Sequence, residues 1–289
     1  MVTTVGDSAG DELEDSRQSA AGADHRGVLY PTRLPSFVRL PPPEAVASLV
    51  RWFWIPEWRI APGRTSRQHV IAFPAANLVV EPDAVGFFGP TTRSSHRDLT
   101  GTGWAVGALL RPAAVPFFTA TPADLLDSSR PVELPELQRR VAGAMNSRAE
   151  TPQRHRLAVA AFADWLTAAV APPGTHDRLA NAMADLIDSD PGIVRVEDVA
   201  DRLHVSTRTV QRLALRYVGL PPLAMIRRRR LQEAAQRLRA SPDTSLAELA
   251  AQLGYADQAH LAADFRTVLG FTPGAYRRLS APAEGTRDV

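Results

Sequence analysis

The chain has 289 residues, of which 45% are hydrophobic, so it is long enough to form two domains with buried cores. Its formal net charge is only +2 at pH 7, which excludes a uniformly cationic protein. It has no cysteine, which excludes disulfides, cysteine zinc sites and thiol catalysis.

The two ends of the chain differ in composition from the rest. Residues 1–27 are rich in Gly, Ala, Ser and acidic side chains, which bury little apolar surface, so we predict a disordered tail. We expect a second, short tail over 281–289. The N-terminus lacks an apolar signal segment, and the apolar stretch at 157–170 is too short to span a membrane. We therefore expect a cytoplasmic protein without a membrane partner.

Residues 28–133 have the pattern of a β-domain. Short apolar runs alternate there with Pro and Gly, in the order SFVRL, VRWFWI, HVIAF, NLVVEP, VGFFGP and WAVGALLRP. This pattern predicts short strands separated by turns. Several such strands at regular spacing indicate a small β-barrel or sandwich.

Four residues of this β-domain are candidates for binding a small effector molecule. Trp52 and Trp54 are two residues apart, so they share one face of a strand, and Trp104 adds a further ring. Such rings line pockets for apolar or planar ligands, and Arg111 is suited to pair with an acidic group. The alternative is that the rings fill the core of the domain and that Arg111 forms an ordinary ion pair.

The sequence offers no motif for catalysis or metal binding. It contains no paired-carboxylate motif and no Gly-rich phosphate loop. His69 and His96 are too few to supply the three or four ligands that a metal site needs. We therefore expect no catalytic residue, no metal and no cofactor, and thus no enzyme.

Residues 134–171 predict two helices, because apolar residues recur at helical spacing on both sides of Thr151-Pro152. One alternative is that this helical pair joins two protomers. The other is that it packs on its own β-domain. The Pro-Pro-Gly stretch within 172–176 predicts a short, stiff linker, and 177–280 has the helical pattern of a separate domain.

Residues 196–218 have the pattern of a helix, a tight turn and a second helix. Ser206 precedes the second helix and is a suitable N-cap, because its hydroxyl can accept a hydrogen bond from a backbone amide of the first turn. Val210, Leu213 and Tyr217 form the inward stripe of that helix. The outward side chains suit contacts with DNA, and the candidates are Ser206, Thr207, Arg208, Thr209, Gln211, Arg212 and Arg216.

Residues 245–269 repeat this pattern. Ser245 and Glu248 match a capping box. Gly254 suits a turn with positive φ, and Asp257 precedes the next helix as its cap. The candidate DNA-contacting residues of this module are Asp257, Gln258, His260 and Arg266. Few of them can read bases, so we predict that the first module specifies the DNA sequence and the second mostly anchors.

The helix expected between the modules carries four consecutive arginines, Arg227 to Arg230, which we place on its outer surface. One alternative is that they contact DNA phosphates. The other is that they form a solvated face. The surrounding segment, 202–239, contains many arginines and one acidic residue, and such a basic block suits a surface that faces a duplex.

The two modules and the segment after them resemble the DNA-binding domain of AraC/XylS-type transcription regulators. The matching stretches lie within 192–278 and read LHVSTRTVQRL, LQEAAQRLRA, SLAELAAQLGY and FRTVLGFTPGAYRR. The resemblance implies an α+β chain with a small β-barrel or cupin-like sensor domain, a helical hairpin and an all-α double helix-turn-helix domain. It implies a sequence-specific regulator that binds double-stranded DNA and is controlled by a small effector or by dimerisation.

The same resemblance implies a homodimer as the expected assembly and RNA polymerase as a further partner. Two alternatives are a ligand-independent architectural DNA binder and a cupin-type enzyme with an attached DNA-binding domain. The chain departs from the family pattern at His204, where most members have Gly. We predict a left-handed backbone there, which costs a non-Gly residue about 1 kcal/mol.

Overall fold

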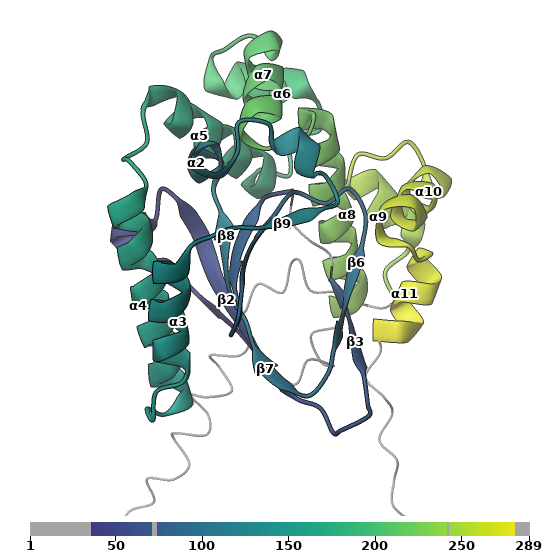
Figure 1. The fold of residues 1–289 in the computed structure, drawn as a ribbon. Helices are drawn as coiled ribbons and strands as arrows, with labels where there is room; N and C mark the ends of the chain where they lie inside the picture. Colours follow the sequence, from purple (N-terminus) through teal and green to yellow (C-terminus); the bar gives the residue numbers. More distant parts are fainter. Residues whose placement is uncertain (1–35, 71–73, 242, 281–289) are drawn as a thin grey trace, which may run out of the picture.

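The computed structural model describes residues 36–70, 74–241 and 243–280, and the structural statements below concern these residues. The tails expected at 1–27 and 281–289 lie outside them. An antiparallel β-sheet domain precedes a set of helices, which confirms the α+β class. Figure 1 shows a curved sheet with one pair of helices on its outer face and the later helices above and beside it.

The strands of the β-domain are short and separated by turns. They are β1 (Phe37–Leu40), β2 (Val50–Arg59), β3 (Ser66–Val70), β4 (Asn77–Val80), β5 (Val85–Phe88), β6 (Ser95–Leu99), β7 (Thr102–Trp104), β8 (Val106–Leu110) and β9 (Ser129–Pro131). The larger sheet has the order β1-β2-β8-β4-β5-β9, with β7 beside β2, and its pairings are antiparallel. β3 and β6 form a separate two-stranded sheet. The described strands therefore leave an open sheet and do not close into a barrel.

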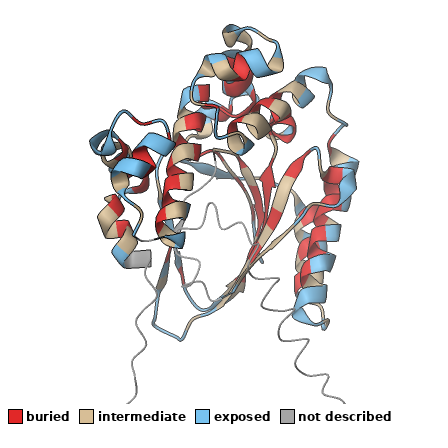
Figure 2. Ribbon diagram, turned by 180° about the vertical axis from the view of Figure 1, so that it is seen from behind, coloured by how far each residue is buried: buried red, intermediate tan, exposed pale blue. Residues whose placement is uncertain are grey.

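Alternate residues of β2 point to opposite faces of the sheet. Phe53 and Ile55 are fully buried and face the helices α3 (Pro135–Met145) and α4 (Thr151–Ala169). Phe53 packs edge-on against Phe162 of α4, with ring centroids 5.3 Å apart, and Figure 2 shows buried residues along the inner side of this helix pair. The pair thus packs on its own β-domain. Contact between two protomers through its outer face stays a prediction.

The C-terminal helices form two apolar clusters joined by one long helix. They are α5 (Thr175–Ser189), α6 (Val196–Leu203), α7 (Thr207–Tyr217), α8 (Pro222–Ala240), α9 (Leu246–Gln252), α10 (Gln258–Leu269) and α11 (Pro273–Ser280). Met225 and Ile226 of α8 belong to the cluster around α5, α6 and α7. Leu231 and Leu238 belong to the cluster around α9, α10 and α11. Because α8 is part of both cores, it connects the two helix-turn-helix modules as a rigid spacer.

The β-domain packs directly against the helices that follow the linker. Short helical turns between β8 and β9 supply much of the contact, and they are η3 (Pro112–Ala114), α2 (Val115–Phe118) and η4 (Pro122–Leu125). Asn181 of α5 is buried. Its Oδ1 accepts from Ala113 N at 2.9 Å and its Nδ2 donates to Ser48 O at 2.8 Å. Because a buried amide is stable only when its hydrogen bonds are made, these two bonds fix α5 on the β-domain.

Candidate nucleic-acid interface

The first module turns at His204, between α6 and α7. The backbone of His204 is left-handed, with φ 53° and ψ 44°, as we predicted. The next amide, Val205 N, donates to Ala200 O at 3.0 Å and so closes the end of α6. A left-handed backbone costs a non-Gly residue about 1 kcal/mol, although His tolerates it better than most residues.

Ser206 fixes the start of α7. Its Oγ accepts a hydrogen bond from Thr209 N at 3.1 Å, which confirms it as the N-cap. The two side-chain hydroxyls of Ser206 and Thr209 also lie 3.0 Å apart. The first turn of α7 is therefore held in place before any ligand arrives.

α7 separates its side chains by polarity. Val210, Leu213 and Tyr217 are buried, as the stripe predicted. The exposed residues of the opposite face are Arg208, Gln211, Arg212, Leu215 and Arg216. Arg can bond guanine through two hydrogen bonds and Gln can bond adenine in the same way. The outward face of α7 thus carries the groups of a base reader, and contact with DNA stays a prediction for each of them.

The second module repeats the turn and the cap. Gly254 has φ 69°, and Asp257 Oδ1 accepts from His260 N at 2.7 Å, so both predicted features are confirmed. The exposed residues of α10 include Gln258, Ala259, His260, Ala263 and Arg266. The ring of His260 packs edge-on against Tyr255, with centroids 5.2 Å apart. This contact restrains one of the few polar side chains that α10 presents.

The capping box predicted for Ser245 and Glu248 is wrong. Ser245 occupies the N-cap of α9, but its side chain accepts no capping hydrogen bond. Both residues are exposed, so water can solvate the first amides of α9 and no packing holds the hydroxyl over the helix end. Glu248 still lies in the first turn, where a negative charge is favourable.

The prediction that Arg227 to Arg230 cover the outer surface of α8 is wrong for two of the four, while Arg227 and Arg230 are partly exposed. Arg228 and Arg229 are only 3% and 5% exposed. Arg229 donates to Ile193 O at 2.8 Å and pairs with Glu233 at 2.9 Å, so it joins α8 to the segment before α6. Its guanidinium is used inside the protein and does not face a phosphate.

The other two arginines of this run also contact neighbouring elements. Arg227 pairs with Asp264 of α10, with Nη2 and Oδ1 2.6 Å apart. Arg230 lies over the ring of Tyr255, 4.0 Å from its centroid. The four arginines therefore hold α8 against its neighbours, and neither alternative offered by the sequence describes them as a group.

The structure does not bring the four candidate effector-binding residues together. Trp104 is 8% exposed and belongs to the core beneath α3 and α4. Arg111 forms an ion pair with Asp185 of α5. Trp104 is therefore a core ring and Arg111 forms an ordinary ion pair, as the structural alternatives stated.

Trp52 and Trp54 share the face of β2 that points away from α3 and α4. Trp52 lies between two cations, with the guanidinium carbons of Arg39 and Arg51 at 4.8 and 5.1 Å from its ring centroid. Trp54 donates from its Nε1 to Asn77 Oδ1 at 3.0 Å. Trp54 borders a hollow of about 430 Å³, and Trp104 borders a separate one of about 440 Å³ beside β7. Of the two, the hollow at Trp54 has the more apolar lining.

The hollow beside Trp54 lies on the inner side of the sheet. It reaches from β4 and β5 to β6 and to the segment before β9. Residues that line it include Trp54, Asn77, Phe88, Thr91, His96 and Asp127. Aromatic surface and convergent polar groups thus meet in one place, as they do in small-molecule pockets.

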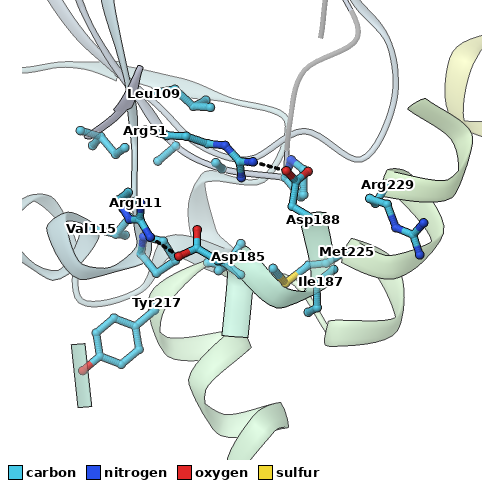
Figure 3. Close-up of a pocket in the computed structure, with 17 residues that line it drawn as sticks. Arg51, Leu109, Arg111, Val115, Asp185, Ile187, Asp188, Tyr217, Met225 and Arg229 are labelled. Atoms are coloured by element: carbon cyan, nitrogen blue, oxygen red, sulfur yellow. Dashed lines mark hydrogen bonds and ion pairs between the residues drawn. The ribbon is translucent and has the colours of Figure 1, made fainter. Parts of the chain in front are cut away.

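A much smaller cavity of about 40 Å³ lies where α5 meets the β-domain (Figure 3). Two ion pairs flank it, Arg51 with Asp188 and Arg111 with Asp185. These two acids were not among the residues predicted from the sequence. Asp185 and Asp188 stand three residues apart and so share one face of α5, and this spacing could have marked them as a pair of surface acids. Their partners could not be inferred, because Arg51 and Arg111 lie far away in the chain. The cavity is too small for an effector and is part of a packed junction.

Membrane-spanning helices and metal-binding clusters are both absent from the described residues. None of their helices is long and apolar enough to cross a membrane. They also contain no group of three or more His, Asp or Glu side chains that could hold a metal ion.

Two family models match the chain in separate regions. A model described as "Helix-turn-helix domain" matches residues 199–279, which include the second module and all but the first three residues of the first. A model described as "Domain of unknown function (DUF6597)" matches residues 38–131, which include the strands of the β-domain.

Two relatives match a part of the chain. The HTH-type transcriptional activator RhaS of Escherichia fergusonii is 36% identical over 104 residues, which are 36% of this chain and 37% of that protein. An AraC-like transcription regulator of Streptomyces lividans is 37% identical over 83 residues, which are 29% of this chain and 27% of that protein. The matched region therefore spans well under half of either relative. The crystal structure of ToxT from Vibrio cholerae is 10% identical, covers 86% of this chain and 97% of that one, and has a TM-score of 0.39.

Proposed function

The chain belongs to the AraC-type helix-turn-helix family and carries a DUF6597 domain, and from this premise we propose that it binds a specific sequence of double-stranded DNA and thereby regulates transcription. The observation that carries the proposal is the exposed polar face of α7. Arg208, Gln211 and Arg212 project from a helix whose first turn is capped and whose opposite face is buried. Side chains held in this way can read base edges in a major groove.

Both modules take part in this proposal, but unequally. The rigid helix α8 connects them, and recognition helices of one DNA-bound protein enter successive major grooves about 34 Å apart. α7 offers three polar base readers on its exposed face. α10 offers Gln258 and a His260 that already contacts Tyr255. We therefore assign sequence discrimination mainly to the first module and anchoring mainly to the second.

Selection of bound DNA from a random pool with the full chain tests this function. We expect a site with two elements one helical turn apart, of which one carries more sequence information. Arg212→Ala should weaken binding to the selected site, whereas Arg156→Ala, an exposed arginine of α4, should leave it unchanged. A protein that prefers no double-stranded sequence at low ionic strength would contradict the proposal.

Control by a small molecule is the second part of the proposal, and the hollow beside Trp54 supports it. Its volume of about 430 Å³ falls within the range of ligand pockets. The rings of Trp54 and Phe88 and the polar groups of Asn77 and His96 all border it. This is the sensor role expected of a cupin-like domain, here placed on an open sheet.

A thermal-shift screen against metabolites tests the sensor role. The matched variant is Ser95→Trp, because Ser95 is exposed and lines the hollow, so a large ring there fills the space without disturbing the core. A ligand that raises the melting temperature of the parent should not raise that of the variant. The alternative of an architectural DNA binder requires that no ligand stabilises the parent.

Two protein partners complete the proposal. The family resemblance favours a second copy of this chain and, during transcription, RNA polymerase. Light scattering with and without the selected DNA measures whether a second copy of the chain binds. A mass of one chain without DNA, and of one chain plus one duplex with it, would contradict a homodimer.

A further inference from the structure

The segment between β5 and β6 is held in shape by Asp127. Thr92 N donates to Asp127 Oδ1 at 2.8 Å, and the Thr92 hydroxyl donates to the other carboxylate oxygen at 2.5 Å. Asp127 itself has a left-handed backbone, with φ 54°. Such a conformation costs a non-Gly residue energy and persists only where its surroundings enforce it. Asp127 is therefore a point at which the β-domain holds strain.

A buried arginine of α8 reaches this point from the helical side. Arg228 is 3% exposed, and its Nη2 lies 3.4 Å from the Thr91 hydroxyl. Burial lowers the pKa of Arg228 and the negative charge of Asp127 partly opposes this effect, so the net pKa is about 10. The guanidinium thus remains charged at neutral pH. Asp127 fixes Thr92, and the neighbouring Thr91 presents its hydroxyl to Arg228, so Asp127 helps to hold the segment against which α8 lies.

The same segment also contacts the second recognition helix. Ser94 N donates to Val268 O at 2.8 Å, near the C-terminal end of α10. Gly270, which ends α10 with φ 80°, lies so close that a Cβ there would stand 3.3 Å from Ser94 Oγ. One short segment of the β-domain therefore contacts both the connecting helix and the end of the second recognition helix.

The first module meets the β-domain through different elements. Its helix α5 carries Asp185 and Asp188, which pair with Arg111 and Arg51. Gly219, after α7, has φ 85°, and a Cβ there would lie 2.6 Å from the backbone of η4. Each module is thus fixed to the β-domain at its own contact. The relative placement of the two modules depends on the β-domain as well as on α8.

We propose that Asp127 is a positioning residue for the second reading module, acting on it through segment 91–94, which contacts Arg228 of α8 and the end of α10. The proposal rests on the proposed DNA-binding function, since its consequence is the spacing at which the two recognition helices meet DNA. Asp127 also lines the hollow assigned above to an effector. A ligand bound there is within reach of Thr91 and Asp127, which belong to the contact that places the second module.

Distance measurements between paired labels in the full chain test the positioning directly. The chain has no cysteine, so two introduced cysteines take up spin labels without background. Asp83→Cys in the β-domain, combined with Ala251→Cys of α9, reports on the second module, and combined with Asp201→Cys of α6 it reports on the first. All three positions are exposed. Asp127→Asn removes the charge and keeps a residue that tolerates a left-handed backbone.

In Asp127→Asn we expect the distribution of distances between positions 83 and 251 to broaden or shift, and that between 83 and 201 to stay unchanged. Asp124→Asn, an exposed acid of η4, is the control and should change neither. Arg228→Met, which removes the contact with Thr91, should reproduce the effect, and the double variant should add little to it. An unchanged distribution between 83 and 251 in folded Asp127→Asn would overturn the proposal, as would an equal change at both label pairs.

DNA binding provides the functional readout. The parent should discriminate between its selected site and the same site with one extra base pair between the two elements. Asp127→Asn should reduce that ratio of affinities about fivefold, the low end of coupling between linked sites. An unchanged ratio would also overturn the proposal. If the parent selects no DNA at all, the proposed function fails, while the label distances still decide whether Asp127 positions the second module.

Discussion

His204 and Gly254 occupy equivalent places in the two modules, and both have a left-handed backbone, with φ 53° and 69°. The amide that follows each of them donates to an alanine carbonyl one turn back, Val205 N to Ala200 O at 3.0 Å and Tyr255 N to Ala250 O at 2.9 Å. The two modules thus contain the same left-handed turn, with Gly254, which adopts this backbone readily, in the second module and His204 in the first.

Replacing His204 with Gly should stabilise the protein. The left-handed conformation costs a non-Gly residue about 1 kcal/mol, and His204 is exposed, so loss of its ring removes little packing. The greater backbone freedom of Gly in the unfolded chain offsets part of the gain. We expect a higher melting temperature by calorimetry. Gly254→Ala, the opposite substitution at the equivalent turn, is the control and should lower the melting temperature. An unchanged or lower value for His204→Gly would show that the turn is not strained.

Two serines at helix starts should respond differently to substitution by Ala. Ser206 accepts a hydrogen bond from Thr209 N, whereas the side chain of Ser245 makes no capping bond. Loss of a bonded N-cap costs about 1 kcal/mol. We therefore expect Ser206→Ala to lower the free energy of unfolding by about that amount and Ser245→Ala to change it little. Denaturant titration measures both, and equal losses would contradict the assignment of the caps.

The sequence predicted these turns and caps because each depends on residues within one helical turn of one another. Ser206, Asp257 and Gly254 act on neighbouring backbone groups, so their roles could be inferred from spacing alone. Ser245 shows the limit of that inference. A matching pair of residue types permits a capping box, but the side-chain conformation is decided by local solvation.

Features that depend on distant parts of the chain could not be predicted in this way. Arg228 looked exposed because nothing in α8 reveals that the β-domain covers it. Arg111 and Trp104 were grouped with Trp54 by residue type, and the fold separates them, since one meets α5 and another lies in the core. The separate pairing of β3 with β6 likewise depends on the tertiary fold, which strand patterns alone do not determine.

Arg229 should matter for stability and not for the electrostatics of DNA binding. It is buried and bonds Ile193 O and Glu233. Removal of one partner of a buried pair costs about 3–5 kcal/mol, and the low end applies because Glu233 keeps Arg237 as a partner. We expect Arg229→Ala to lower the unfolding free energy and to leave the salt dependence of DNA binding unchanged.

The exposed Arg208 is the matched control for Arg229. Arg208→Ala should leave stability unchanged, and if this side chain contacts a phosphate it should reduce the salt slope by about one. Binding isotherms at several salt concentrations measure the slope. A reduced slope in Arg229→Ala, at a temperature where the variant is folded, would restore the phosphate interpretation.

Asp198 should make the first module sensitive to acid. Partial burial raises the pKa of Asp198. Hydrogen bonds from Val194 N at 2.9 Å and Arg195 N at 2.8 Å lower it by more than burial raises it, so the net pKa is below its ordinary value of 3.8. A lowered pKa means that the ionised form stabilises the fold at higher pH and that this contribution is lost as pH falls through the folded-state pKa. Asp198→Asn should therefore be less stable than the parent at pH 7, and the difference should shrink below pH 4. A constant difference across this range would contradict the role of the charge.

The unequal division of reading between the modules gives the sharpest test of the interface. Arg212 is exposed on α7 beside Gln211, whereas Gln258 on α10 is followed by Ala259 and by His260, which packs on Tyr255. Loss of a bidentate base contact costs about 1–3 kcal/mol and relaxes one position of the site. Arg212→Ala should reach that range and lose discrimination at one base pair, whereas Gln258→Ala should cost less and leave the preferred sequence unchanged. Each variant is assayed against the site randomised one element at a time. Equal sequence information in both elements would contradict the asymmetry, because it would require α10 to read bases as well as α7 does.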